Sequence, residues 1–154
     1  MKLAGFLLVV LACAADTRSP DPRDPGDPTQ KTHVILTAGA PRQDLALSAL
    51  ATPPATLTLT IAAIDNPSSQ AFSLGASVMW SATGAGAIEE TIGSIAPYPA
   101  TEPGSFALGV PEAARRTLAR SDGQLSLRLS LQPIAADRPL ADPLRVTLGD
   151  PAWR

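Results

Sequence analysis

The sequence predicts an all-β protein, a single antiparallel β-sandwich of about seven strands with one short helix near residues 111–121. Segments that alternate apolar and polar residues recur along the chain, most clearly from Leu125 to Leu131, where every second residue is a leucine. Turn-forming residues separate these segments, as they do in antiparallel sheets. Hydrophobic residues make up 45% of the chain and aromatic residues 4%, so aliphatic side chains must form most of the core.

Seven segments have the pattern of strands. In chain order they are residues 31–38, 55–64, 71–80, 88–95, 105–110, 125–131 and 144–148. Residues 43–51 are ambiguous between a short strand and a helical turn. Within the third segment, Gly75 predicts a β-bulge or a close approach of two backbones.

Two of the connecting segments have sequences that are typical of particular structures. Residues 81–86 are rich in glycine but lack the Gly-Lys-Ser/Thr ending of a phosphate-binding loop, so we expect a hairpin between two strands. Pro111 and Glu112 are typical of the first turn of a helix, and the Ser-Asp-Gly sequence at 121–123 is typical of its end.

Residues 1–12 have the features of a secretory signal peptide. Lys2 supplies the positive charge, and the apolar run that follows it is too short to span a membrane. The only cysteine of the chain, Cys13, ends the sequence Val-Leu-Ala-Cys, which resembles the lipobox of bacterial lipoproteins. That resemblance implies that Cys13 is lipidated and becomes the first residue of the mature protein. The alternative is ordinary signal cleavage after Ala14, which would remove Cys13.

The same resemblance implies a location and a membrane contact. An exported lipoprotein is held in the bacterial cell envelope by its N-terminal lipid, and Ala14 after the cysteine favours the outer membrane, on the side that faces the periplasm. The domain plan is then a signal peptide over residues 1–12, a lipidated cysteine and Pro/Asp-rich tether over 13–30, and the sandwich over 31–154. The prolines favour an extended tether, in which the aspartates between them do not converge on a calcium ion.

Charge and composition exclude several classes of function. The formal net charge of -2, with no window rich in Lys or Arg, argues against a nucleic-acid partner. His33 is the only histidine, and we expect it at the surface or on an edge strand rather than on a metal. Glu89 and Glu90 are neighbours on a predicted strand, so they point to opposite faces and do not form a catalytic pair. We therefore expect no catalytic residue, no metal, no cofactor and no enzymatic activity.

Two aromatic residues are candidate contacts for a partner protein. Tyr98 lies between two prolines in a proline-rich loop, residues 96–103, and a rigid loop with one aromatic side chain is a plausible contact site. The alternative is that Tyr98 packs back onto the rim of the sandwich. Trp153 lies in the C-terminal tail, where it is either exposed or docked on the sandwich.

Residues 102–133 have the order strand, Val-Pro, short helix, leucine strand. The residues that carry this pattern are Glu102, Gly104, Ser105, Phe106, Val110, Pro111, Leu127, Leu129, Leu131 and Pro133. The pattern resembles the C-terminal β-sandwich domain of tyrosinases and plant polyphenol oxidases. The copper chemistry of that family belongs to a separate helical domain with six histidines, so the resemblance implies no copper site in this chain. It implies that the sandwich packs on, shields or helps to mature a copper-oxidase domain, here on another chain.

Together these observations predict a lipid-anchored envelope protein. Its sandwich is expected to be a non-catalytic binding or accessory module, with a tyrosinase-like copper oxidase as one candidate partner and other envelope proteins as the remaining candidates. The alternative is a structural, adhesion or pilus-like subunit that assembles by strand exchange, which requires an incomplete sandwich with an open groove.

Overall fold

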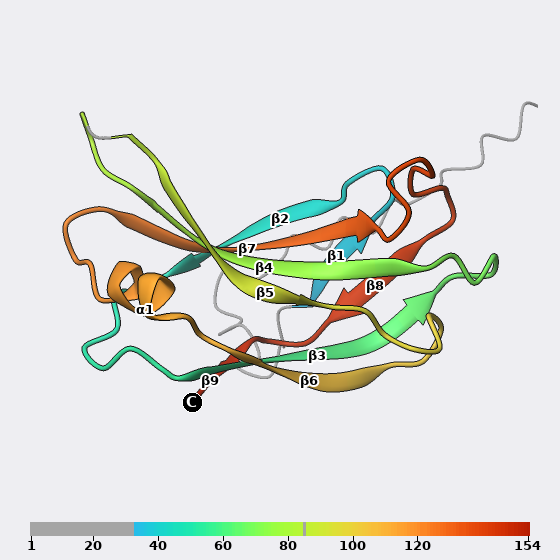
Figure 1. Cartoon of the computed structure of the whole chain (residues 1–154), viewed down its shortest axis with the longest axis horizontal. Helices are drawn as coiled ribbons and strands as arrows, with labels where there is room; N and C mark the ends of the chain where they lie inside the picture. The colour runs from blue at the N-terminus through green and yellow to red at the C-terminus, as the bar shows by residue number, and fades with distance from the viewer. Residues whose placement is uncertain (1–32, 85) are drawn as a thin grey trace, which may run out of the picture. The chain divides into compact units, whose positions relative to one another are not determined.

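The structure, a computed structural model, describes residues 33–84 and 86–154, which form two antiparallel sheets and one helix (Figure 1). The strands are β1 (Val34–Thr37), β2 (Arg42–Leu47), β3 (Thr56–Asp65), β4 (Phe72–Ser81), β5 (Ile88–Ile95), β6 (Gly104–Gly109), β7 (Gln124–Pro133), β8 (Arg145–Leu148) and β9 (Ala152–Trp153), and α1 (Glu112–Leu118) lies between β6 and β7. The predicted all-β sandwich is confirmed. The described residues contain nine strands rather than about seven, because the ambiguous segment forms β2 and the tail forms β9.

The two sheets have a simple order. One is β1-β8-β3-β6 and the other is β2-β7-β4-β5. β9 pairs with the start of β3, on the edge that β8 also uses, because β6 occupies the opposite edge of β3. β4 and β5 are neighbours in one sheet, as the predicted hairpin requires, and Gly84 in the turn has φ 80°, a conformation that suits glycine.

An aliphatic layer between the sheets forms the core. The side chains that the alternation pattern placed on one face are all buried: Leu57, Leu59 and Ile61 of β3, Phe72, Leu74, Val78 and Trp80 of β4, and Leu125, Leu127, Leu129 and Leu131 of β7. β3 and β7 are inner strands of their sheets, so their buried faces lie in the middle of this layer. Burial of each such leucine contributes about 1.5–3 kcal/mol, which makes the layer the main stabilising feature of the domain.

Gly75 lies at a close approach between β4 and β7, but the bulge expected at this glycine lies on the neighbouring strand β5. The register between β4 and β5 shifts near it, because Ala76 pairs with Gly93 and Ser77 with Thr91, so the extra residue is Ile92 of β5. A Cβ atom on Gly75 would lie 2.9 Å from the side-chain oxygen of Ser130 on the neighbouring β7. The glycine therefore makes room for the Ser130 side chain, and the bulge belongs to β5 rather than to β4.

α1 covers one end of the interlayer. It begins after Pro111 with Glu112 in its first turn, and it buries Ala114, Thr117 and Leu118. The helix ends at Leu118 with Ala119 as its C-cap, so it is shorter than the predicted 111–121. Beyond the helix, the guanidinium of Arg120 lies 4.4 Å from the ring centroid of the buried Trp80. This cation–π contact fixes the chain as it leaves the helix toward β7.

The turn before β7 has no room for a side chain, which gives a test of the packing. A Cβ atom on Gly123 would lie 2.5 Å from the backbone oxygen of Ser81 and 2.6 Å from Nε1 of Trp80. We expect Gly123→Ala to lower the free energy of unfolding by about 1–3 kcal/mol, because the backbone must shift to accept the methyl group. Chemical denaturation followed by tryptophan fluorescence measures this change.

The matched control is Gly39→Ala, because a Cβ atom on Gly39 would have no atom within 4 Å. That variant should stay within about 0.5 kcal/mol of the parent protein. Equal stability of the two variants would contradict the close packing of this turn.

Candidate functional site

Three loops gather at the end of the sandwich that lies opposite α1 (Figure 1, right). They are the β3–β4 loop (residues 66–71), the β5–β6 loop (residues 96–103) and the β7–β8 loop (residues 134–144). We call this surface the loop end. Loops held at one end of a rigid sandwich commonly carry its contact residues, because they can vary without disturbing the core.

Asn66 joins the first two of these loops. Its side chain is buried, with 4% of its surface exposed. Nδ2 donates hydrogen bonds to the backbone oxygens of Gln70 at 2.9 Å and of Ala100 at 3.0 Å, and Oδ1 accepts one from the backbone N–H of Gln70 at 3.0 Å. A buried amide with its donors and acceptor satisfied holds loop backbones more specifically than apolar packing does.

Gln70 joins the third loop to the first. Its Nε2 donates to the backbone oxygen of Pro139 at 2.9 Å, and its Oε1 accepts from the backbone N–H of Ala141 at 3.1 Å. The two amide side chains, Asn66 and Gln70, therefore tie all three loops together. The loop end is braced by polar contacts within the chain.

Tyr98 is displayed on this braced surface. Its side chain is 97% exposed, so the alternative, in which it packs on the rim of the sandwich, is wrong. The backbone N–H of Glu102 donates to the oxygen of Pro99 at 3.2 Å and closes the loop behind Tyr98. The bonds Tyr98–Pro99 and Asp142–Pro143, both in loops of the loop end, are cis. Ile134, at 57% exposure, is a second exposed apolar side chain on these loops.

Trp153 lies away from Tyr98. It pairs with Leu57 near the start of β3, whereas the loop end begins after the last residue of that strand. The side chain is half-buried and packs against the core, and backbone bonds between Arg154 and Thr56 hold the tail in place. Of the two alternatives for Trp153, docking is therefore the one observed. The structure does not bring the two candidate contact residues into one surface.

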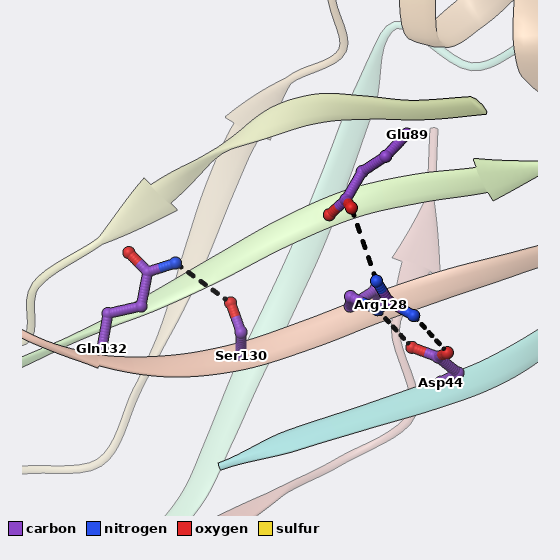
Figure 2. Close-up of polar contacts among 5 residues, drawn as sticks. All are labelled: Asp44, Glu89, Arg128, Ser130 and Gln132. Carbon is purple, nitrogen blue, oxygen red and sulfur yellow. Dashed lines mark hydrogen bonds and ion pairs between the residues drawn. The ribbon is translucent and has the colours of Figure 1, made fainter. Parts of the chain in front are cut away.

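A polar network that was not predicted from the sequence lies on the outer face of the β2-β7-β4-β5 sheet (Figure 2). Arg128 of β7 forms a bidentate ion pair with Asp44 of β2, with two N–O distances of 2.8 Å, and reaches Glu89 of β5 at 3.4 Å. The hydrogen bond from Arg128 holds the pKa of the Asp44 carboxyl below its ordinary value. One feature of the sequence pointed to this network: Arg128 is the one charged residue between the leucines of the predicted strand, where the other outward-facing residues are serines. Because β7 lies between β2 and β4, its outward side chains can reach residues on both sides.

Two depressions adjoin at Arg128, with volumes of about 700 and 440 Å³. The smaller one is lined by polar groups such as Arg42, Ser77 and Thr91. The charge of Arg128 is already balanced by two carboxylates. Asp44 and Arg128 are directly opposite each other on β2 and β7, so their ion pair favours the register of these two strands. This face therefore has an evident structural role, and the loop end is the stronger candidate for a contact site.

The remaining predicted site residues have these outcomes. Cys13 and the tether lie outside the described residues. His33 is exposed. Glu89 and Glu90 point to opposite faces as predicted, since Glu89 meets Arg128 on the outer face and Glu90 is opposite the buried Val78. Within residues 33–84 and 86–154, no set of three His, Cys, Asp or Glu side chains is grouped to hold a metal ion, and no helix has the length and apolar character to cross a membrane.

Comparisons of the chain with protein-family models, with curated proteins and with solved structures found no match. The strand, helix and strand predicted within residues 102–133 occur as β6, α1 and β7. The resemblance to the tyrosinase-type domain and the resemblance to the lipobox stay predictions.

The loop end can be tested through Asn66. We expect Asn66→Asp to lower the free energy of unfolding at pH 7 by about 1–3 kcal/mol, because a carboxylate would face two backbone oxygens that now accept hydrogen bonds. Hydrogen exchange of loop amides should also become faster in residues 66–71 and 96–103. Ser68→Ala is the control, since Ser68 makes a single long bond of 3.4 Å to Asn66. Unchanged exchange in both loops would contradict the bracing role.

Proposed function

We propose that the protein is a lipid-anchored component of the bacterial cell envelope whose sandwich is a binding or accessory module, and that the loop end is its contact surface. The observation that supports a contact role is Tyr98, which is 97% exposed on a loop that Asn66 ties to the β3–β4 loop. Gln70 ties that second loop to the β7–β8 loop. The support for anchoring is Cys13 at the end of the Val-Leu-Ala-Cys sequence.

Tyr98 suits a contact role for a physical reason. A tyrosine has a large apolar ring with one polar group and only two rotatable side-chain bonds, so burying it against a partner gains contact area at a small cost in entropy. The loop that carries it is already closed by the Glu102–Pro99 hydrogen bond. Binding would therefore require little further ordering of the chain.

The class of partner follows from two lines of reasoning. The resemblance of residues 102–133 to the tyrosinase-type sandwich favours a copper oxidase on another chain, which the module would shield or help to mature. The filled interlayer of the described sandwich favours such a module over a subunit that assembles by strand exchange, because strand exchange needs an apolar groove that a donor strand can fill.

Anchoring is tested by metabolic labelling with palmitate in the native cell. We expect the parent protein to incorporate the label and to fractionate with the outer membrane, because a lipidated Cys13 would hold it there. Cys13→Ser should remove the label and shift the protein to the soluble fraction, whereas Ala14→Ser should change neither. An unlabelled parent protein, with Cys13→Ser unchanged in location, would overturn the anchor.

The contact surface is tested by recovery of partners from detergent-solubilised envelope, with mass spectrometry of the bound proteins. We expect Tyr98→Ala to lower the recovered partner at least tenfold, which corresponds to about 1.4 kcal/mol of binding free energy, because the variant removes the large exposed ring that the loop offers to a partner. Stability should change by less than about 0.5 kcal/mol, since the side chain is exposed.

Tyr98→Phe, which keeps the ring, and Ile35→Ala, which removes an exposed apolar side chain on β1, are the controls and should retain the partner. A copper oxidase among the recovered proteins would support the accessory role, and other envelope proteins alone would leave a binding module of another class. Equal recovery by Tyr98→Ala and the parent protein would exclude Tyr98 as the contact.

A further inference from the structure

Among the described residues, the outer edge of β6 has no partner strand. In the part of the chain that the structure describes, β6 pairs with β3 on one side and is the last strand of its sheet on the other. The backbone N–H of Val110 donates to the oxygen of Ala55, and antiparallel strands alternate the direction of their backbone groups. The backbone groups of Ser105, Ala107 and Gly109 therefore point away from β3. All three of these residues are exposed.

The other edges of the two sheets carry features that oppose pairing with a further strand. β1 has four residues, and β2 presents the exposed charged residues Arg42 and Asp44. β5 carries Glu89 and Glu90 and has a shifted register against β4. Short length, charge and bulges are the usual means by which edge strands avoid association. β6 has six residues without a charge or a proline, and its register against β3 is regular.

We propose that β6 is a self-association edge, through which two copies of this chain pair in antiparallel fashion about Ala107. The two sheets that contain β6 then become one continuous sheet across a two-fold axis. Ala107 lies opposite Ala107 of the second copy, and Ser105 lies opposite Gly109 of the second copy. These are the residues whose backbone groups point outward, so each of these pairs is a hydrogen-bonded pair.

The side chains of β6 support this register. Phe106 and Leu108 are half-buried. Leu108 lies close to Gly93 of β5: a Cβ atom on Gly93 would be 3.4 Å from a methyl carbon of Leu108. Pairing about Ala107 places Phe106 opposite Leu108 of the second copy. This position is a non-hydrogen-bonded pair, in which side chains lie closest, so the exposed parts of both residues become covered.

The outward face of β6 also permits the pairing. Ser105, Ala107 and Gly109 are small, so two twisted sheets can meet without a clash between side chains. No like charges meet at the joint, whereas pairing of β2 about Asp44 would place two carboxylates opposite each other. Because the small and apolar residues of β6 are spaced symmetrically about Ala107, the partner that fits this edge best is β6 of a second copy.

The expected association is weak in solution. One pair of short strands buries less surface than the roughly 1,200–2,000 Å² of a stable interface, so we expect a dimer at about 100 µM and above rather than at nanomolar concentration. The two loop ends would lie at opposite ends of the dimer, because β6 runs from the loop end toward α1. Pairing and partner binding at Tyr98 can therefore be tested separately, and either can fail without the other.

The first test is disulfide cross-linking of the full chain in the oxidising periplasm. Ala107→Cys places two thiols at the two-fold axis, with the Cα–Cα separation of about 5.5 Å that hydrogen-bonded strand pairs have and that a disulfide accepts. We expect most of this variant to migrate at twice the monomer mass without reductant and at the monomer mass with it.

The matched control is Ala46→Cys, an exposed alanine on β2. The backbone bond from Leu131 to Pro41 shows that the N–H of Ala46 also points away from its neighbouring strand. This variant should remain monomeric. Cross-linking of Ala46→Cys equal to that of Ala107→Cys, or none in Ala107→Cys, would overturn the proposal.

The second test is sedimentation of the detergent-solubilised protein over a range of concentrations. Ala107→Pro removes an outward N–H but no bond between β6 and β3, so it should abolish the dimer, whereas Ala46→Pro should leave it intact. A parent protein that stays monomeric above about 100 µM would also overturn the proposal. If Ala107→Pro does not fold, the cross-linking result decides alone.

Discussion

The aliphatic layer between the two sheets is the constraint on which the rest of the structure depends. β3 buries alternate side chains from Leu57 to Ile61 in this layer, β7 does so from Leu125 to Leu131, and all of these side chains are leucine or isoleucine. Because the layer supplies most of the stability, residues outside it, such as Tyr98 and Ala107, are free to serve other purposes. A fully exposed tyrosine gains nothing for folding, which is why its presence on a braced loop supports a role in contact.

The two ends of the sandwich are closed by different physical means. At the α1 end, closure is largely apolar: Ala114 and Leu118 are fully buried, and Arg120 covers Trp80. At the loop end, the amides of Asn66 and Gln70 take this role, through hydrogen bonds to loop backbones. Polar bracing fixes backbone positions while leaving the loop surface free, and a surface of that kind is pre-organised for a partner.

Local patterns explain what the sequence could predict. The leucines of β7 and the Leu-Thr alternation of β3 define their strands without reference to the rest of the chain, and the structure confirms both. β2 was ambiguous because only its last residues alternate and its first three are exposed polar residues. Contacts between distant residues were beyond reach: Arg128 pairs with Asp44, 84 positions away, and Asn66 reaches Ala100 across 34 positions. The exposure of Tyr98 depends on how those loops close, so it too required the structure.

The proposed anchor and the proposed β6 pairing reinforce each other. A single pair of uncharged strands is too weak to hold two free molecules together at low concentration. Lipid anchoring of both copies in one membrane would confine them to a thin layer and raise their effective concentration, so that weak pairing becomes significant. An edge without charges is a risk for a freely diffusing protein at high concentration, because it can also recruit unrelated strands. On an anchored protein the same edge would mostly meet other copies of itself, and its self-complementary spacing about Ala107 favours that encounter.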